Sequence, residues 1–255
     1  MGSVMICTSR RQFLGLSALA PLAATAACTQ TPPPESAAPP ITLAPPRSQS
    51  PLRTGTMPFG PEPRFPPFEE MYATKRDGGF TIPAIPYERV PERYLRQVVR
   101  DTTREAPGTV VVDTRQHFLF LALGNGNAIR YGVGLGRAGF EWSGRAEVGA
   151  RRRWPRWFPP DEMIDREPEL ERYRASDKDG DNVWEGGMDP GITNPLGARA
   201  LYIYQDGKDT LYRLHGNPQW TSIGQSVSSG CVRLMNQDVI DLYSRVPEGT
   251  PIVVR

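Results

Sequence analysis

The sequence predicts a mainly β domain over residues 107–255, sandwich- or barrel-like and with a few short helices. Short β-rich runs alternate there with clusters of Gly, Asn, Asp and Pro, and only one convincing amphipathic helix is present, near the end. A domain of about 150 residues buries roughly 68–70% of its unfolded surface, so it needs neither a disulfide nor a metal to fold. The excess of strands over helices favours two packed sheets or one closed sheet.

Six runs supply the predicted strands. They are residues 109–114 (TVVVDT), 117–123 (HFLFLAL), 127–136 (NAIRYGVGLG), 200–204 (ALYIY), 210–216 (TLYRLHG) and 251–255 (PIVVR). The sequence LGNGNA between the second and third runs predicts a hairpin turn. Alternation with Phe118 and Phe120 places His117 at an exposed position of its strand.

The predicted helix begins at Asn236, which can cap it, and carries Asp238 in its first turn. Its apolar face follows the helical spacing i, i+3, i+4 and i+7, at Val239, Leu242, Tyr243 and Val246. Pro247 then ends the helix.

Residues 1–28 have the pattern of an export signal. Arg10 and Arg11 precede an uncharged run that ends at Ala27, the order typical of a twin-arginine signal, and this run is shorter than the roughly 20 apolar residues that span a bilayer. Small residues before Cys28 resemble a lipoprotein-processing site. Lipidation of Cys28, which would anchor the protein to a membrane, and simple cleavage after a small residue both stay open.

Two segments lie between this signal and the β domain. Residues 29–81 are predicted to be a disordered, proline-rich linker, because Pro and small residues dominate and no apolar periodicity indicates a core. Residues 82–106 are predicted to be a short helical lead-in, since Pro91 suits a first helical turn and the apolar residues between 94 and 99 fall on one side.

The strand pattern is interrupted at about 151–196, where aromatics, prolines and glycines mix. Loops longer than about 15 residues are usually functional or disordered, so this stretch is predicted to be an insertion that borders the active site. Its basic run at 151–156 is followed by acidic residues, and the whole chain has 30 Lys and Arg against 28 Asp and Glu, a net charge of +2. This balance gives no indication of a nucleic-acid partner.

Cysteine usage predicts a nucleophile at Cys231. In an exported protein, Cys7 and Cys28 leave with the signal or are blocked by lipid, so Cys231 has no second cysteine with which to form a disulfide in an oxidising compartment. A thiol with a pKa of about 8.5 needs a base at neutral pH. His215, at the end of a predicted strand, is the candidate base.

The neighbours of Cys231 complete the predicted site. Gly230 and Cys231 offer backbone N–H groups for an oxyanion hole. In an extended chain, Val232 points into the core while Arg233 shares the face of Cys231. There the Arg233 guanidinium can bind a substrate carboxylate or stabilise the thiolate, and an ion pair with a surface Asp is the alternative.

Metal chemistry has little support in the sequence. Two histidines and one mature cysteine do not make a zinc site. The stretch DKDGDN at 177–182 has no Gly at the sixth position of a calcium loop, and Met188 stands at the twelfth, where a bidentate Glu belongs. No metal is therefore expected.

The stretch HGNPQWTSIGQSVSSGCVRLMN, residues 215–236, resembles the signature of the L,D-transpeptidase family, in which His-Gly is followed by Ser-x-Gly-Cys-x-Arg and a nearby Asn. The likeness continues through GVGLGRAGFEWSG (132–144) and NPLGARALYI (194–203), so it covers residues 107–255, the expected catalytic domain. It implies a cell-envelope address, no cofactor, and peptidoglycan stem peptides as the substrate.

By this resemblance, Cys231 attacks the carbonyl between the third and fourth residues of a stem peptide and releases D-alanine. The thioester then passes to an amine of a neighbouring stem, which gives a 3-3 cross-link. The resemblance implies His215 as the general base, the N–H groups of Gly230 and Cys231 as oxyanion donors, and Arg233 as support for the site or the substrate. Supporting or substrate-binding roles fall to Ser228, Ser229, Trp220 and Asn236.

Two other functions stay open. The thioester can pass to water, which would make the protein a carboxypeptidase or an amidase that frees an envelope protein from the wall. An envelope protein is also a possible acceptor of the acyl group. The choice of acceptor would lie in the 151–196 insertion and in the loop 217–227. The alternative from another class is a non-catalytic peptidoglycan-binding module.

Overall fold

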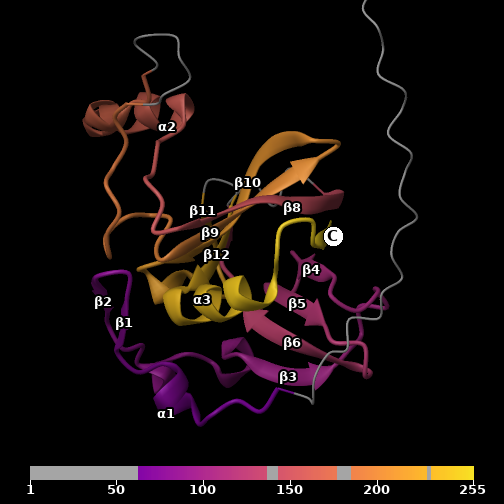
Figure 1. Ribbon diagram of the computed structural model, residues 1–255. Helices are drawn as coiled ribbons and strands as arrows, with labels where there is room; N and C mark the ends of the chain where they lie inside the picture. Colours follow the sequence, from indigo (N-terminus) through magenta and orange to yellow (C-terminus); the bar gives the residue numbers. More distant parts are fainter. Residues whose placement is uncertain (1–62, 137–142, 177–184, 229–230) are drawn as a thin grey trace, which may run out of the picture. The chain divides into compact units, whose positions relative to one another are not determined.

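Nine strands of the described chain pair into one mixed sheet. The computed structural model describes residues 63–136, 143–176, 185–228 and 231–255, which all belong to the unit Thr56–Arg255. Within these residues the strand order is β12-β10-β9-β8-β13-β4-β5-β6-β3 (Figure 1). The bounds are Gln97–Arg100 (β3), Val110–Asp113 (β4), Phe118–Ala122 (β5), Asn127–Gly132 (β6), Gly144–Arg153 (β8), Arg199–Gln205 (β9), Lys208–Asn217 (β10), Val232–Met235 (β12) and Pro251–Val254 (β13).

Most neighbouring strands run antiparallel. The exceptions in this sheet are β13 beside β4 and β10 beside β12, which are parallel. β5 and β6 pair antiparallel from Phe118 opposite Gly132 to Ala122 opposite Ala128, so the predicted hairpin is confirmed. Two small ladders stand apart from the sheet, formed by β1 (Lys75–Asp77) with β2 (Phe80–Ile82) and by β7 (Leu135–Gly136) with β11 (Ser226–Ser228).

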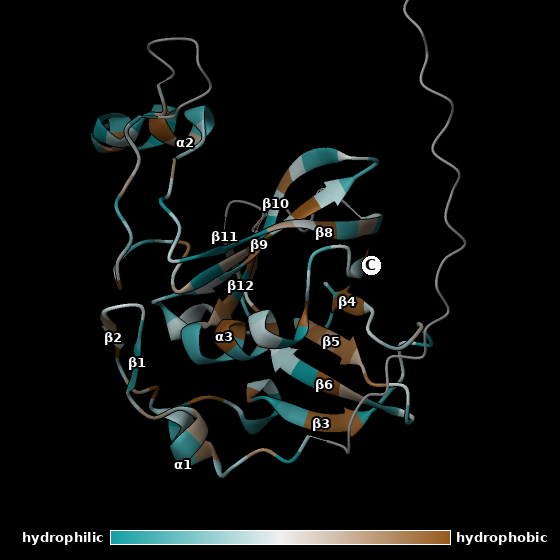
Figure 2. Cartoon of the chain, viewed as in Figure 1, coloured by the Kyte–Doolittle hydropathy of each residue, from teal (hydrophilic) through white to brown (hydrophobic). Residues whose placement is uncertain are grey.

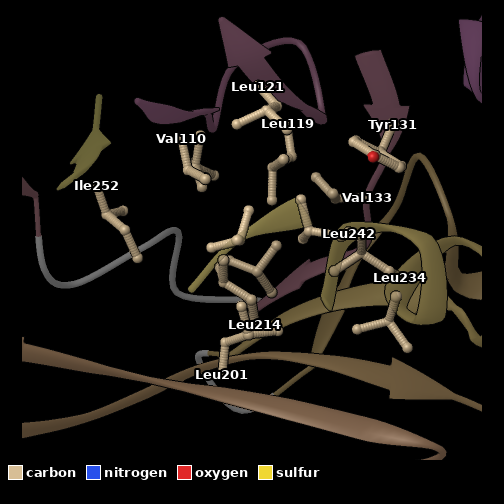
Figure 3. Close-up of a cluster of buried hydrophobic side chains, with 14 of the residues drawn as sticks. Val110, Leu119, Leu121, Tyr131, Val133, Leu201, Leu214, Leu234, Leu242 and Ile252 are labelled. Carbon is tan, nitrogen blue, oxygen red and sulfur yellow. The ribbon is translucent and has the colours of Figure 1, made fainter. Parts of the chain in front are cut away.

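The main core lies between the two halves of this sheet and helix α3 (Asn236–Arg245). Figure 3 shows Val110, Leu119 and Leu121 facing Leu201 and Leu214 across the interior, with Leu242 of the helix beside them. Val239 and Leu242 are fully buried, as the helical spacing predicts. A mainly β, sandwich-like fold with few short helices is thus confirmed.

A second core covers the outer face of β4 and β5. Phe118 and Phe120 of β5 pack there against Tyr72, Tyr94 and other buried residues of the segment 63–100. All five residues of β5 are therefore buried, which explains why this strand is uniformly apolar (Figure 2). His117 is not on this strand: it lies in the preceding turn with φ 59°, and its Nε2 is 3.0 Å from Ser226 Oγ.

The end of the predicted linker and the predicted lead-in form this cover. The linker prediction is wrong for its described end, where α1 (Phe68–Met71) precedes β1 and Tyr72 is fully buried; residues 1–62 lie outside the described part. The prediction of a helical lead-in over 82–106 is also wrong. The structure has two 3₁₀ turns, η1 (Tyr87–Arg89) and η2 (Glu92–Tyr94), followed by β3, because Val98 and Val99 pair with Ile129 and Ala128 at the sheet edge.

The insertion is narrower than predicted. Arg151–Arg153 belong to β8 and pair with Leu201–Arg199 of β9, so the irregular stretch begins at Trp154 and ends before Arg199. It contains α2 (Asp161–Arg166) and η3 (Pro168–Tyr173), which Figure 1 shows away from the sheet. A further 3₁₀ turn, η4 (Trp220–Ser222), follows β10. Among the helices of the described residues, none is both long and apolar enough to cross a membrane.

Candidate active site

Strand registry brings the predicted residues onto one face of the sheet. Residues Leu201, Leu214 and Val232 stand side by side on β9, β10 and β12, and all three are fully buried in the core. Because side chains alternate along a strand, the residues before and after them point to the opposite face. We call this opposite face of β9, β10 and β12 the site face. His215 and Arg233 are directly opposed on it.

Cys231 directly precedes β12, and extending the strand register places it on the same face. Continuing the register of β10 and β12 by one residue sets Cys231 opposite Arg213, two residues before His215. With strands about 4.8 Å apart and about 3.3 Å of rise per residue, the Cα atoms of His215 and Cys231 are then roughly 8 Å apart. This is a distance that an imidazole and a thiol on one face can bridge.

The His215 ring is neutral at neutral pH and is held by a hydrogen bond. Its Nδ1 lies 2.7 Å from the carbonyl oxygen of Gly216, and since a carbonyl can only accept, Nδ1–H donates and the lone pair is on Nε2. Burial lowers the pKa of His215 to about 4, helped by the charge of Arg233 and opposed by the carbonyls of Gly216 and Pro195. The backbone carbonyl of the next residue thus orients the ring.

Cys231 is a partly buried thiol. Burial raises its pKa above the ordinary value. Three groups act in the opposite direction: a hydrogen bond from the Arg213 backbone and the charges of Arg213 and Arg233. At neutral pH the pair is therefore thiol and neutral imidazole rather than thiolate and imidazolium.

Arg233 presents a positive charge at this point of the site face. Its backbone is fixed by a bridge to Gly134, with N–H···O distances of 2.8 and 2.9 Å. Burial lowers the pKa of its guanidinium, and the Cys231 sulfur raises it. In the described part of the chain no carboxylate forms an ion pair with Arg233, and its buried Nε has no hydrogen-bond partner. This arrangement favours a role toward the thiolate or a substrate carboxylate over a surface ion pair.

Asn236 supports the site from behind. It does not cap α3, whose N-cap is Met235; its buried Oδ1 instead accepts the N–H of Ala198 at 2.9 Å. A Cβ added at Gly216 would lie 2.3 Å from that oxygen. Asn236 therefore fixes the segment after the insertion against the end of the strand that carries His215.

The other predicted residues are less closely placed. Trp220 is half-buried in η4, packs on the second core and lies 5.6 Å from the guanidinium of Arg89. Ser228 ends β11 opposite Gly136. Ser229 and Gly230, and with Gly230 half of the predicted oxyanion hole, lie outside the described residues, as does the calcium-like stretch 177–182. In the described ranges, no group of three or more His, Cys, Asp or Glu could hold a metal ion.

Sequence reasoning missed Arg213 and its two partners, Tyr202 and Asp209. Arg213 lies between Cys231 and Tyr202, the residue opposite it on β9, and forms a two-pronged ion pair with Asp209. The signal was present in TLYRLHG, where Arg213 and His215 are two apart and so share a face.

Comparisons with known proteins show a family likeness over the segment that holds these residues. The family model of the YkuD L,D-transpeptidase catalytic domain matches residues 107–254. The probable L,D-transpeptidase YbiS of Escherichia coli is 31% identical over 159 residues, which are 61% of this chain and 46% of the relative, so the chain spans about half the length of such relatives. The putative L,D-transpeptidase YkuD of Bacillus subtilis is 49% identical over 61 residues, 24% of this chain and 37% of the relative.

Solved structures are also similar. One from Brucella melitensis, named as a probable carnitine operon oxidoreductase, is 42% identical and covers 67% of this chain and 99% of its own, with a TM-score of 0.43. An L,D-transpeptidase from Mycobacterium smegmatis is 18% identical, covers 58% of each chain and has a TM-score of 0.39. On the match of the family model to more than half of its length, this chain belongs to the YkuD L,D-transpeptidase catalytic domain family.

Proposed function

We propose that this protein is a peptidoglycan L,D-transpeptidase that forms 3-3 cross-links through a thioester on Cys231. The observation that carries the proposal is the placement of His215, Arg233 and, by the strand register, Cys231 on one face of β10 and β12, inside the segment that matches the family. This set contains what acyl transfer to a thiol needs: a nucleophile, a base and a local positive charge.

The proposed reaction has two steps. The Cys231 sulfur attacks the carbonyl between the third and fourth residues of a donor stem while its proton passes to His215 Nε2. The proton then goes to the leaving amine, and D-alanine departs as the thioester remains. In the second step an acceptor amine attacks the thioester, loses its proton through His215, and leaves Cys231 as a thiol again.

The ionisation of the pair supports a general-base mechanism. Since the pKa of His215 is about 4, its ring is free to accept a proton at neutral pH. Since burial raises the pKa of Cys231, the thiolate forms during the attack rather than before it. General base catalysis of this kind contributes roughly 10²–10⁴-fold to a rate.

The test is incubation of the purified mature protein with tetrapeptide muropeptides, followed by mass analysis. Dimers that have lost D-alanine support transpeptidation, and tripeptides alone would show that water is the acceptor. Intact-protein mass should reveal an acyl-enzyme, and the Cys231→Ala variant should form neither adduct nor dimer. Unchanged cellular muropeptides in Cys231→Ala cells, with wall binding kept, would instead indicate a binding module.

We further propose that the protein is exported to the cell envelope, on the twin-arginine pattern at Arg10 and Arg11. The fate of Cys28 decides between a lipid-anchored and a released form. Mass analysis of the mature N-terminus distinguishes them, because a lipidated Cys28 adds acyl mass and simple cleavage leaves an unmodified small residue or Cys28 first.

A further inference from the structure

Arg213 is the cross-strand neighbour of Cys231. The register of β10 with β12, continued by one residue, sets the two opposite each other, and the backbone of Arg213 hydrogen-bonds the sulfur. On the other side of β10, Arg213 is opposed by Tyr202 of β9. The three residues thus form one row across the site face.

The Arg213 guanidinium is fixed in position. It donates to both oxygens of Asp209, at 2.7 and 2.8 Å, and its centre lies 4.2 Å from the middle of the Tyr202 ring. Only 14% of its side chain is exposed. A two-pronged ion pair with a stacked ring restricts the side chain, and low exposure reduces screening by salt, so the charge acts on its surroundings from one place.

A distortion of β10 builds this arrangement. The register with β9 shifts between Asp209 and Arg213, and Leu211 inside the shift has φ 64° and is 76% exposed. A bulky apolar residue in a left-handed conformation on the surface is unfavourable, and bulges commonly re-aim side chains next to active sites. Here the bulge returns the Asp209 carboxylate to the Arg213 guanidinium.

We propose that Arg213, held by Asp209 and Tyr202, is a positioning residue that stabilises the negative charge on the Cys231 sulfur as the thiol loses its proton. The inference rests on the proposed role of Cys231 as nucleophile. Arg213 exchanges no proton or electron pair: the proton passes to His215, and the sulfur electron pair forms the bond to the acyl carbon.

The charges around the sulfur agree in sign with this role. Arg213 and Arg233 favour the thiolate, while the Asp209 carboxylate opposes it. His215 is neutral and supplies a base without a positive charge. Arg152 of β8 adds a further positive charge on the far side of Tyr202. Arg213 and Arg233 are therefore the two charges that lower the pKa of the Cys231 thiol.

The test measures alkylation of Cys231 by iodoacetamide in the full mature chain, which requires no peptidoglycan. At a fixed pH below the thiol midpoint, Arg213→Gln should slow alkylation by about three- to tenfold, because loss of a neighbouring cation lowers the thiolate fraction. Asp209→Asn, which keeps an oxygen to accept from Arg213, should speed it. Arg145→Gln, which removes an exposed ion pair with Glu105 elsewhere on the sheet, is the control and should leave the rate unchanged.

Opposite effects of the two substitutions, with melting temperatures near wild type, support the inference. Slower alkylation in both variants, or no change in either, overturns it, because a merely structural role cannot separate them by sign. If Arg213→Gln does not fold, the sign of the near-isosteric Asp209→Asn decides alone. Absence of an acyl-enzyme in the wild type would refute the proposed function and leave this alkylation result standing.

Discussion

At the scale of single residues, the site combines two groups that burial keeps neutral. Desolvation disfavours both the imidazolium of His215 and the thiolate of Cys231, so it shifts their pKa values in opposite directions. A preformed thiolate–imidazolium ion pair would need a lowered pKa at Cys231 and a raised pKa at His215. If Cys231 is the nucleophile, as proposed, the charges must be stabilised as they form, and Arg213, Arg233 and the oxyanion donors are the groups proposed for this.

This ionisation predicts an unusual acid limit. The pKa of His215 is about 4 in the fold against 6.5 for an ordinary histidine, so its ring stays unprotonated and able to accept a proton well below pH 6. We expect the acylation rate of Cys231 by muropeptides, relative to the rate at pH 6, to persist at about pH 5 and to fall only toward about pH 4. Intact-protein mass over a pH series measures it; an acid limb centred near 6.5 would contradict the buried, neutral ring.

The same depression predicts a loss of stability in acid. The unfolded chain takes up a proton at His215 near pH 6.5, while the folded chain does so only near 4. The contribution of the neutral His215 ring to folding stability is therefore fully present above about pH 6.5, and it is lost as the pH falls through the folded-state pKa of about 4.

Substitution of His215 separates its chemical role from its packing. His215→Gln removes the basic nitrogen but keeps an N–H that can donate to the Gly216 carbonyl, so we expect a folded protein whose acylation rate is roughly 10²–10⁴-fold lower. The matched control is His117→Gln, at the other histidine of the chain, which contacts Ser226 and should retain near-wild-type acylation. Equal losses in the two variants would argue against His215 as the base.

Alternation along the strands explains what was predictable at this scale. Val232 in the core, with Arg233 on the other face, follows from a period of two. The position of Asn236 did not follow, because a polar residue at a helix start reads as a cap, and only the tertiary fold brings Ala198 within its reach.

At the scale of elements, the segment 63–100 is part of the fold. Its local sequence lacks an apolar period, because its buried residues are anchors spread over turns, such as Met71, Tyr72, Ile85 and Leu95. A period is needed to predict a helix or strand, but isolated anchors can cover a sheet without one. The predicted helical lead-in over 82–106 failed because edge pairing of β3 with β6 outweighed a weak helical pattern.

Tyr72 is the central anchor of this segment. Its buried hydroxyl donates to the Asp238 carboxylate at 3.1 Å and accepts the backbone N–H of Arg96 at 2.7 Å. Asp238 is fully buried, and desolvation raises its pKa to about 7 although the charge of Arg96 opposes this. The protonated Asp238 carboxyl thus contributes fully to folding stability below its ordinary pKa of 3.8. This contribution is lost as the pH rises through the folded-state pKa of about 7.

We expect Tyr72→Phe to destabilise the fold by about 1–3 kcal/mol, because it removes the hydroxyl that accepts from the buried Arg96 N–H and donates to the buried Asp238 carboxylate. Urea unfolding of the mature protein measures this. Tyr87→Phe, at a half-buried tyrosine whose hydroxyl bonds the adjacent Glu88 side chain, should change stability by no more than about 0.5 kcal/mol. Equal effects would mean that the segment is not held by this contact.

At the scale of the whole molecule, the sheet and the insertion are joined through a narrow base. Trp157 and Met188 pair through their backbones at 3.0 and 2.7 Å, and the fully buried Asn194 places its Nδ2 within 3.0–3.2 Å of the carbonyls of Pro155, Met188 and Asp189. Beyond this base, α2 and η3 add few residues to the cores. Composition could predict that an insertion exists, but not this closed base, whose contacts join residues far apart in sequence.

Because the base closes on itself, the outer part of the insertion should be removable. We expect replacement of residues 158–187 by a short Gly-Ser turn to leave the melting temperature within a few degrees of wild type, since the cores keep nearly all their residues. If the insertion selects the acceptor, acylation of Cys231 should continue while dimers fall and tripeptides rise in the muropeptide assay. An unchanged dimer yield would assign the choice of acceptor elsewhere, to the loop 217–227. Asn194→Ala loosens the base without shortening the chain. We expect this variant to shift the ratio of dimers to tripeptides in the same direction as the deletion, by a smaller factor.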